Sequence, residues 1–209
     1  QSRINNELVD TLGNFVNRVI VLTNKYYDGI VPTPNEFSEL DEQTLAELKA
    51  YPEVIASSIE RYRFREALGE MMNVARLGNK YLTETEPWIT IKENPERVKT
   101  QMYVALQITT ALSVLCEPFL PFTASKLRAM LNKNENDVKW SDVSSSSNLI
   151  ESNHKIGQAE ILFSKIEDEE IQKQIDKLEA TKKANVMNDA KAEPQKETAT
   201  FDDFTKLDL

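Results

Sequence analysis

Residues 94–116, Asn-Pro-Glu-Arg-Val-Lys-Thr-Gln-Met-Tyr-Val-Ala-Leu-Gln-Ile-Thr-Thr-Ala-Leu-Ser-Val-Leu-Cys, open with a helix-start signal and continue as a regular apolar repeat. Asn94 is a favoured N-cap residue, Pro95 suits the first helical position, and Glu96 complements the positive end of a helix. The repeat alternates spacings of four and three through Val98, Met102, Ala105, Thr109, Leu112 and Cys116. Helices this regular pack as antiparallel bundles, so we expect an all-α fold.

Outward from this stretch, the apolar periodicity predicts a bundle of about five helices, the others spanning residues 2–27, 41–60, 64–84 and 123–131. Pro52 lies inside the second helix and should kink or divide it. After the bundle we expect a C-terminal arm over 159–166, either a strand or an extended segment, and a polar helix over 168–185. Residues 186–200 hold few apolar side chains and predict a flexible tail.

Composition and charge exclude several classes of function. The chain has 209 residues and a net charge of −9, which disfavours nonspecific nucleic-acid binding. Residues 1–165 carry 22 acidic and 18 basic side chains, so a local basic face is compatible with that part. No apolar run is long enough to span a bilayer, and the polar start Gln1-Ser2-Arg3 does not resemble a signal peptide, so no membrane partner is expected.

Cys116 and His154 are the only cysteine and the only histidine in the sequence. They exclude a disulfide framework and a Cys/His zinc site built within this chain. A catalytic Cys/His pair is disfavoured because Cys116 belongs to an apolar helical stripe and His154 to a polar loop. We expect neither metal nor cofactor in this chain, and a reducing, cytoplasmic location.

One further stretch, residues 79–88, ends a helix with a proline that is followed by a tryptophan. Pro87 should stop the helix near Thr85 and leave Trp88 half exposed at the helix end. Trp88 could cap the core, or it could stack on an unpaired RNA base. Asn14 and Arg18, four residues apart, share a face of the first helix and could contact bases or bond within the bundle.

Several motifs together resemble the anticodon-binding domain of methionyl-tRNA synthetase, a class I aminoacyl-tRNA synthetase. The similarity covers about residues 7–178, and its specific part is the Asn14-x-x-x-Arg18 pair together with Pro87-Trp88. The stretches that carry or agree with the resemblance are 12–18, 24–29, 62–68, 79–88, 118–124 and 161–166. The resemblance implies the helical bundle of that domain type.

The resemblance also implies recognition of methionine tRNA through its CAU anticodon, with Asn14, Arg18, Pro87 and Trp88 as the binding residues. In relatives, the residue matching Trp88 stacks on the cytosine. The parent protein would be a methionine–tRNA ligase that uses ATP, but the chain lacks the His-x-Gly-His and Lys-Met-Ser-Lys-Ser signatures of the catalytic domain. This chain alone is therefore expected not to be catalytic. ATP belongs to the missing part, for which zinc is left open.

Three parts follow from these patterns: a bundle with its returning arm over 1–166, a polar helix and linker over 167–200, and a final segment over 201–209. The final segment resembles the first strand of the tRNA-binding OB-fold domain that mediates dimerisation in some relatives. Because only its opening is present, we expect this chain to be a monomer and leave open a homodimeric parent. The competing interpretation is a helical protein-interaction scaffold with an acidic tail and no RNA role.

Overall fold

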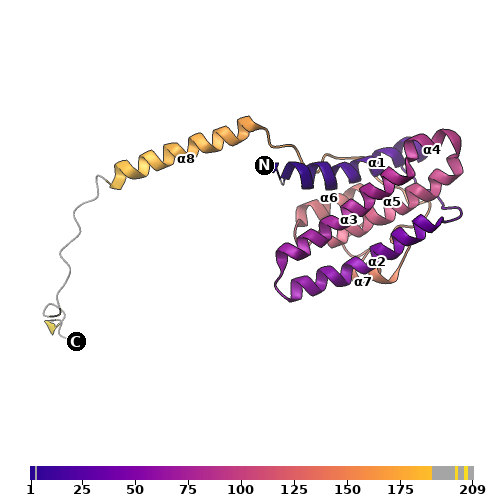
Figure 1. The fold of residues 1–209 in the computed structure, drawn as a ribbon, viewed down its shortest axis with the longest axis horizontal. Helices are drawn as coiled ribbons and strands as arrows, with labels where there is room; N and C mark the ends of the chain where they lie inside the picture. The colour runs from indigo at the N-terminus through magenta and orange to yellow at the C-terminus, as the bar shows by residue number, and fades with distance from the viewer. Residues whose placement is uncertain (3, 190–200, 202–204, 207–209) are drawn as a thin grey trace. The chain divides into compact units, whose positions relative to one another are not determined.

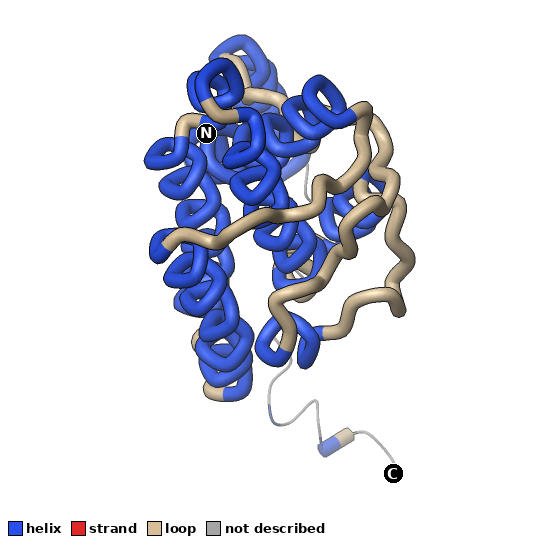
Figure 2. The backbone as a smooth tube through the Cα atoms, turned by 90° about the vertical axis from the view of Figure 1, so that its right-hand side faces the viewer, coloured by secondary structure: helices blue, strands red, loops and turns tan. Residues whose placement is uncertain are grey.

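The computed structural model describes residues 1–2, 4–189, 201 and 205–206. The chain divides into two compact units, Gln1–Lys165 and Ile166–Leu209, and each is described by itself. Within the described residues every regular element is a helix, apart from one isolated bridge between Ile30 and Lys155 (Figures 1 and 2). The expected all-α fold is confirmed.

The elements follow one another along the chain as η1 (Ile4–Gly13), α1 (Asn14–Tyr27), α2 (Glu39–Glu60), α3 (Phe64–Thr85), α4 (Pro87–Glu93), α5 (Pro95–Leu115), α6 (Pro121–Met130), α7 (Trp140–Ser145) and α8 (Asp168–Asp189). The predicted five-helix bundle corresponds to η1–α1, α2, α3, α5 and α6. The short helices α4 and α7 were not predicted. The first part of the predicted helix over 2–27 is π-helical, which a four-residue apolar spacing such as Leu8–Leu12 does not distinguish from α-helix.

Helix α5 lies at the centre of the bundle and contacts α1, α2, α3, α4 and α6 (Figure 1). It begins as predicted, because the Asn94 side chain accepts a hydrogen bond from the Arg97 amide at 3.1 Å and Pro95 occupies the first turn. All six residues of the predicted stripe are fully buried. Buried hydroxyls on this helix are satisfied locally, as when Thr109 donates to the Ala105 carbonyl. The helix whose apolar pattern indicates the fold therefore lies in the core of the bundle.

Helix α2 runs through Pro52 without being divided. Its start carries a capping box, in which the Ser38 hydroxyl and the Asp41 carboxylate each accept a hydrogen bond from the other residue's amide. Pro52 is buried, and its carbonyl accepts a hydrogen bond from the Trp140 indole at 3.3 Å. The contact places α7 against α2, so Trp140 anchors an otherwise polar stretch of chain.

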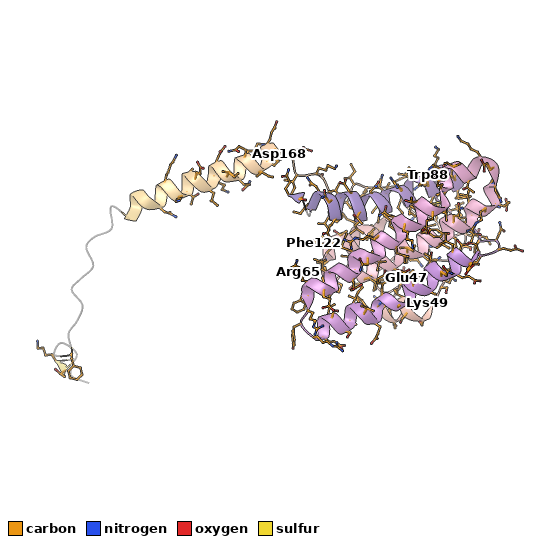
Figure 3. All side chains as sticks on the ribbon, viewed as in Figure 1. Glu47, Lys49, Arg65, Trp88, Phe122 and Asp168 are labelled. Carbon is orange, nitrogen blue, oxygen red and sulfur yellow. The ribbon has the colours of Figure 1, made fainter. Side chains whose placement is uncertain are left out.

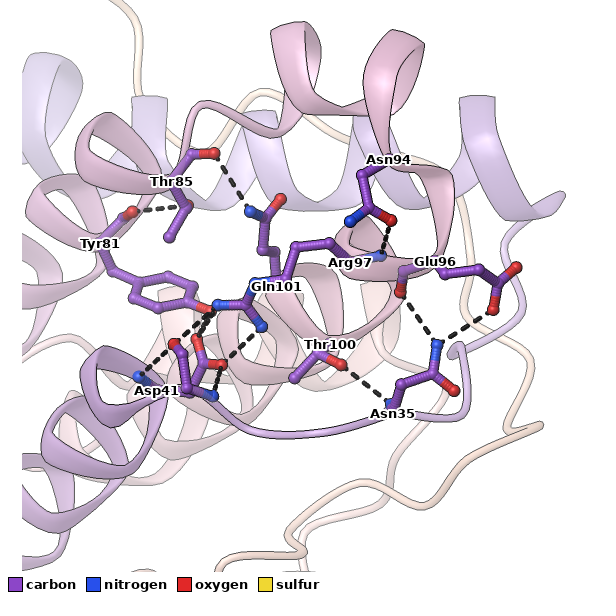
Figure 4. Close-up of polar contacts among 10 residues, drawn as sticks. Asn35, Asp41, Tyr81, Thr85, Asn94, Glu96, Arg97, Thr100 and Gln101 are labelled. Atoms are coloured by element: carbon purple, nitrogen blue, oxygen red, sulfur yellow. Dashed lines mark hydrogen bonds and ion pairs between the residues drawn. The ribbon is translucent and has the colours of Figure 1, made fainter.

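A buried polar network joins α2, α3 and α5 (Figure 4). The fully buried Asp41 carboxylate accepts hydrogen bonds from Tyr81 at 2.6 Å and from two nitrogens of Arg97 at 2.6 and 2.8 Å. Burial alone raises the pKa of Asp41, but the hydrogen bonds from Arg97, Tyr81 and Ser38 outweigh it, so its pKa lies below the usual value. Burial and the bond to Asp41 also raise the pKa of Tyr81. The network therefore links helices α2, α3 and α5 to one another.

The segment after α7 returns along the bundle without regular structure and ends as an extended arm over residues 158–165. The buried Gln107 side chain fixes its beginning, donating to the Ile150 carbonyl and accepting from the Leu149 amide. Further on, Asn24 at the end of α1 donates to the Gly157 carbonyl at 3.0 Å. Leu162 and Phe163 pack against the core. The alternative of a strand at 159–166 is not realised.

In the second unit, α8 continues to Asp189, four residues beyond the predicted polar helix. Its Ile171, Ile175 and Leu178 share one face with Glu170 and Gln174. The rest of the predicted linker, residues 190–200, lies outside the described residues. So does most of the segment 201–209 that resembles the start of an OB-fold domain.

Candidate functional site

The end of α3 sets the position of Trp88. The helix stops after Thr85 because Glu86 adopts a left-handed backbone conformation, with φ of 41°. Its amide still bonds to the Leu82 carbonyl at 3.0 Å. The Thr85 carbonyl accepts hydrogen bonds from Thr90 at 2.9 Å and from the buried Gln101 at 3.2 Å. These bonds attach the α3–α4 junction to the central helix.

Helix α4 then begins at once, with Pro87 as its first residue. The predicted end near Thr85 is confirmed, but Trp88 lies in the first turn of a new helix. Pro87 is buried, so the geometry gives it the role of fixing the backbone beneath Trp88. The structure thus places a rigid aromatic side chain on a junction that is bonded at both ends.

Trp88, labelled in Figure 3, is half-buried, and its side chain packs against the hydrophobic core. The Arg18 guanidinium of α1 lies over the indole ring, with the Arg18 Cζ 5.8 Å from the ring centroid. A cation in this position is attracted by the negative face of the ring, by roughly 0.5–1 kcal/mol at a surface site. The two proposed site residues are therefore in direct contact, although 70 residues of chain separate them.

Helix α1 presents three polar side chains, Asn14, Asn17 and Arg18, at spacings that place them on one face. Asn17 and Arg18 are exposed, and Asn14 is half-buried. Among the described residues, none of the three side chains forms a hydrogen bond or ion pair with another part of the protein. Neither an intrabundle bond for Asn14 nor an acidic partner for Arg18 is present there. Their donors and acceptors remain available to a ligand.

Two adjacent hollows flank these side chains. One, of about 270 Å³, is lined by Asn17, Arg18, Val21, Leu22 and Trp88. The other, of about 330 Å³, lies between the first helical segment and the arm, and its lining residues are Val9, Asp10, Gly13, Asn14, Asn17, Ile161, Leu162 and Phe163. Asn17 lines both. We call these the indole hollow and the arm hollow.

The structure thus unites Arg18 and Trp88 in the indole hollow and places Asn14 in the neighbouring arm hollow. Sequence reasoning did not single out Asn17. Its signal was its position three residues after Asn14 and directly before Arg18, next to the apolar run over residues 19–22. The arm residues that complete the second hollow could not be placed from spacing, because they lie more than 140 residues away in the sequence.

Among the described residues, Cys116 and His154 do not form a second site. Burial raises the pKa of the Cys116 thiol to about 12, so it stays protonated at neutral pH. The His154 ring is bonded to the Leu131 carbonyl at 2.7 Å. The described part of the chain holds no cluster of three or more His, Cys, Asp or Glu side chains suited to a metal ion. Among the same residues, no helix has the length and apolar character needed to cross a membrane.

The helical bundle and its face of free amides, a guanidinium and an aromatic ring define an α-helical domain suited to binding unpaired bases. Residues 31–183 match the sequence profile of the family described as the anticodon binding domain of methionyl tRNA ligase. The chain belongs to this family. The matched range contains Trp88 but begins after Asn14, Asn17 and Arg18.

Relatives extend the similarity over the whole chain. The methionine–tRNA ligase of Flavobacterium psychrophilum is 70% identical over 209 residues, which are 100% of this chain and 30% of that protein. The methionine–tRNA ligase of Flavobacterium johnsoniae is 64% identical over 234 residues, covering 100% of this chain and 33% of the relative. The chain therefore spans about a third of the length of these relatives.

Solved structures agree in fold. The apo form of Mycobacterium tuberculosis methionyl-tRNA synthetase superimposes with a TM-score of 0.73 at 25% identity, over 79% of this chain and 34% of that one. The same enzyme in complex with methionyl-adenylate gives a TM-score of 0.72 at 24% identity, over 78% of this chain and 32% of that one. About four-fifths of this chain therefore shares its fold with a part of these enzymes.

Proposed function

We propose that the bundle recognises the CAU anticodon of methionine tRNA as part of a methionine–tRNA ligase. The observation that carries the proposal is the contact between Arg18 and Trp88 beside free amide side chains. Unpaired loop bases are recognised by stacking on aromatic rings and by hydrogen bonds to their exposed edges. The indole hollow offers both kinds of interaction within one small surface.

Trp88 supplies the stacking platform in this proposal. Its ring is held by the core beneath it and by the Thr85 carbonyl bonds behind it, so little conformational entropy is lost when a base stacks. A base–aromatic stack is worth about 1–3 kcal/mol. The first anticodon base, cytosine, stacks here.

Arg18 and Asn14 supply base-edge contacts. The planar guanidinium can donate two parallel hydrogen bonds to acceptors on a base, and the amide offers both an acceptor and donors. Arg18 is free of carboxylate partners within the described residues, so it does not have to break an ion pair to bind. Pro87 positions Trp88 rather than contacting the base with its buried ring.

The rest of the ligase supplies the chemistry. Methionine activation requires ATP and a catalytic domain whose signatures this chain does not contain. We expect the 209-residue chain to be a monomer and leave open a homodimeric parent. The bundle contributes recognition of the tRNA, and the ligase as a whole works in the cytoplasm.

The competing function is a helical protein-interaction scaffold, which the acidic net charge favours. The two functions differ in what the α1 face does. A scaffold function does not use a guanidinium over an indole, nor two neighbouring asparagines that form no hydrogen bond within the described residues. RNA recognition uses each of these groups. We therefore favour RNA recognition.

Binding of a synthetic anticodon stem-loop to the 209-residue chain tests the proposal. The parent should bind a CAU loop more tightly than a UAU loop, and Trp88→Ala should weaken CAU binding by about 1–3 kcal/mol, or roughly 5- to 150-fold. Trp88→Phe should retain most of the stacking. Ile91→Ala is the matched control, because Ile91 packs against the core from the same helix but does not line the indole hollow. Equal affinity of the parent and a folded Trp88→Ala variant for CAU would refute the proposal.

A further inference from the structure

The arm hollow adjoins the indole hollow, and Asn17 forms part of the wall of both. Consecutive bases of an unpaired loop are joined by one phosphate, so a protein that splays them apart must offer two neighbouring sites. Resting on the proposed function, we infer that the arm hollow holds the base next to the one stacked on Trp88, and that Asn17 reads this second base. No role was assigned to Asn17 or to the arm hollow from the sequence.

The arm hollow is a built site rather than a gap between loosely packed segments. The arm runs antiparallel to the first helical segment, with Gly157 bonded to Asn24 at one end and Lys165 paired with Asp10 at 3.2 Å at the other. Between these fixed points, Phe163 lies against Gly13. A β-carbon added at Gly13 would be only 3.4 Å from the Phe163 ring and 3.2 Å from the Leu8 carbonyl. The glycine therefore lets the arm approach closely enough to close one wall.

The lining suits the flat, polar-edged shape of a nucleobase. Val9, Leu162 and Phe163 offer apolar surface to the faces of a base, and Asn14 and Asn17 offer amides to its edge. At about 330 Å³ the hollow is at the lower end of the range for small-ligand sites. The hollow therefore has room for a single base.

The amide groups favour adenine. An asparagine side chain can accept from the exocyclic amino group of adenine while it donates to an adjacent ring nitrogen, the pairing used for adenine in duplex DNA. Guanine presents a carbonyl at the position of that amino group and keeps the ring-nitrogen acceptor, so an amide oriented for adenine would set its own oxygen against the guanine oxygen and lose that bond. The middle base of the proposed CAU anticodon is adenine, and it follows directly on the cytosine assigned to Trp88.

The charges at the rim allow an RNA backbone to approach. Among the described residues, Asp10 is the one carboxylate that lines the arm hollow, and Lys165 pairs with it. The ion pair offsets a negative charge that would otherwise repel the phosphate joining the two bases. Arg18 adds a positive charge on the neighbouring hollow. The local balance near Asn17 is therefore more favourable to RNA than the net charge of the chain.

Asn17→Ala in the full chain tests the assignment against three stem-loops: CAU, CGU with a changed middle base, and UAU with a changed first base. Asn17 is exposed and unbonded within the described residues, so the variant should fold, which far-ultraviolet circular dichroism checks. We expect its CAU affinity to fall about tenfold, the preference for CAU over CGU to be mostly lost, and the preference over UAU to remain. Asn136→Ala, an exposed loop asparagine away from both hollows, should match the parent.

The outcomes separate this inference from the function on which it rests. An equal loss of affinity for all three loops would overturn the base assignment, because it would indicate a phosphate or sugar contact. Unchanged binding by Asn17→Ala would also overturn the base assignment. The proposed function would still stand if Trp88→Ala lost only the preference for CAU over UAU. A parent chain that binds none of the loops would overturn both.

Discussion

Arg97→Met should destabilise the bundle by about 3 kcal/mol, because it removes the charged partner of a fully buried carboxylate. Asp41 has no exposed surface, and the Arg97 side chain retains 23% exposure. Breaking a buried ion pair from one side costs about 3–5 kcal/mol. The lower end applies here, since Tyr81 and the Ser38 amide still donate to Asp41 after the change.

Thermal and urea unfolding at neutral pH, followed by circular dichroism, measure this loss. For a unit of this size, 3 kcal/mol corresponds to a fall in Tm of about 6–12 °C. Lys99→Met is the matched control, because Lys99 pairs with Glu96 on the same helix but both side chains are exposed. That variant should lose less than about 1 kcal/mol.

A second substitution separates the charge from the packing. Asp41→Asn in the Arg97→Met background replaces the uncompensated carboxylate with a neutral amide, so part of the lost stability should return. Equal and small losses for Arg97→Met and Lys99→Met would refute the view that this network joins the three helices. A double variant less stable than Arg97→Met would show that the cost did not come from the buried charge.

Three further outcomes are expected. Because the pKa of Asp41 is lowered on folding, its contribution to stability is complete above the unfolded pKa of about 3.9 and is lost as the pH falls through the folded pKa. Acid titration of the parent should therefore show a loss of folding stability that the Asp41→Asn variant lacks. Gly78→Ala should destabilise the fold by about 1–3 kcal/mol in urea unfolding despite the better helix propensity of alanine, because the new β-carbon would lie 2.4 Å from the Phe15 ring; an increase in stability would mean that this ring moves easily. Trp88→Ala should lower the unfolding free energy by less than the roughly 3–5 kcal/mol of a fully buried aromatic, since the ring is half-buried, and a loss within that range would assign Trp88 to the core.

Apolar periodicity was sufficient to predict the long helices of the bundle, because each of them buries a continuous stripe. It did not predict α4, which is too short to show a repeat and depends on Pro87 and on the bonds of Thr85 to later residues. It also did not predict α7, whose position depends on the indole of Trp140 reaching the Pro52 carbonyl. Both helices depend on tertiary contacts that a local pattern cannot contain.

The candidate site was predictable in part for the same reason. Asn14 and Arg18 are four residues apart on one helix, so their shared face follows from helix geometry. The meeting of Arg18 with Trp88 followed only from resemblance, because nothing local links α1 to α4. The arm hollow required knowledge of where residues 161–163 lie, and no spacing rule relates them to Gly13.

The arm also has a consequence for the order of folding. The hydrogen bond between Asn24 and Gly157 closes a loop of 133 residues, so it forms only after a large entropic cost has been met. During synthesis, α1 leaves the ribosome long before the segment that covers it. The wall of the arm hollow therefore does not exist until the chain has been made to about residue 165. Until then, the Leu8 side of the first helix lacks the cover of Phe163, and a nascent chain at this stage exposes apolar surface that a chaperone can bind.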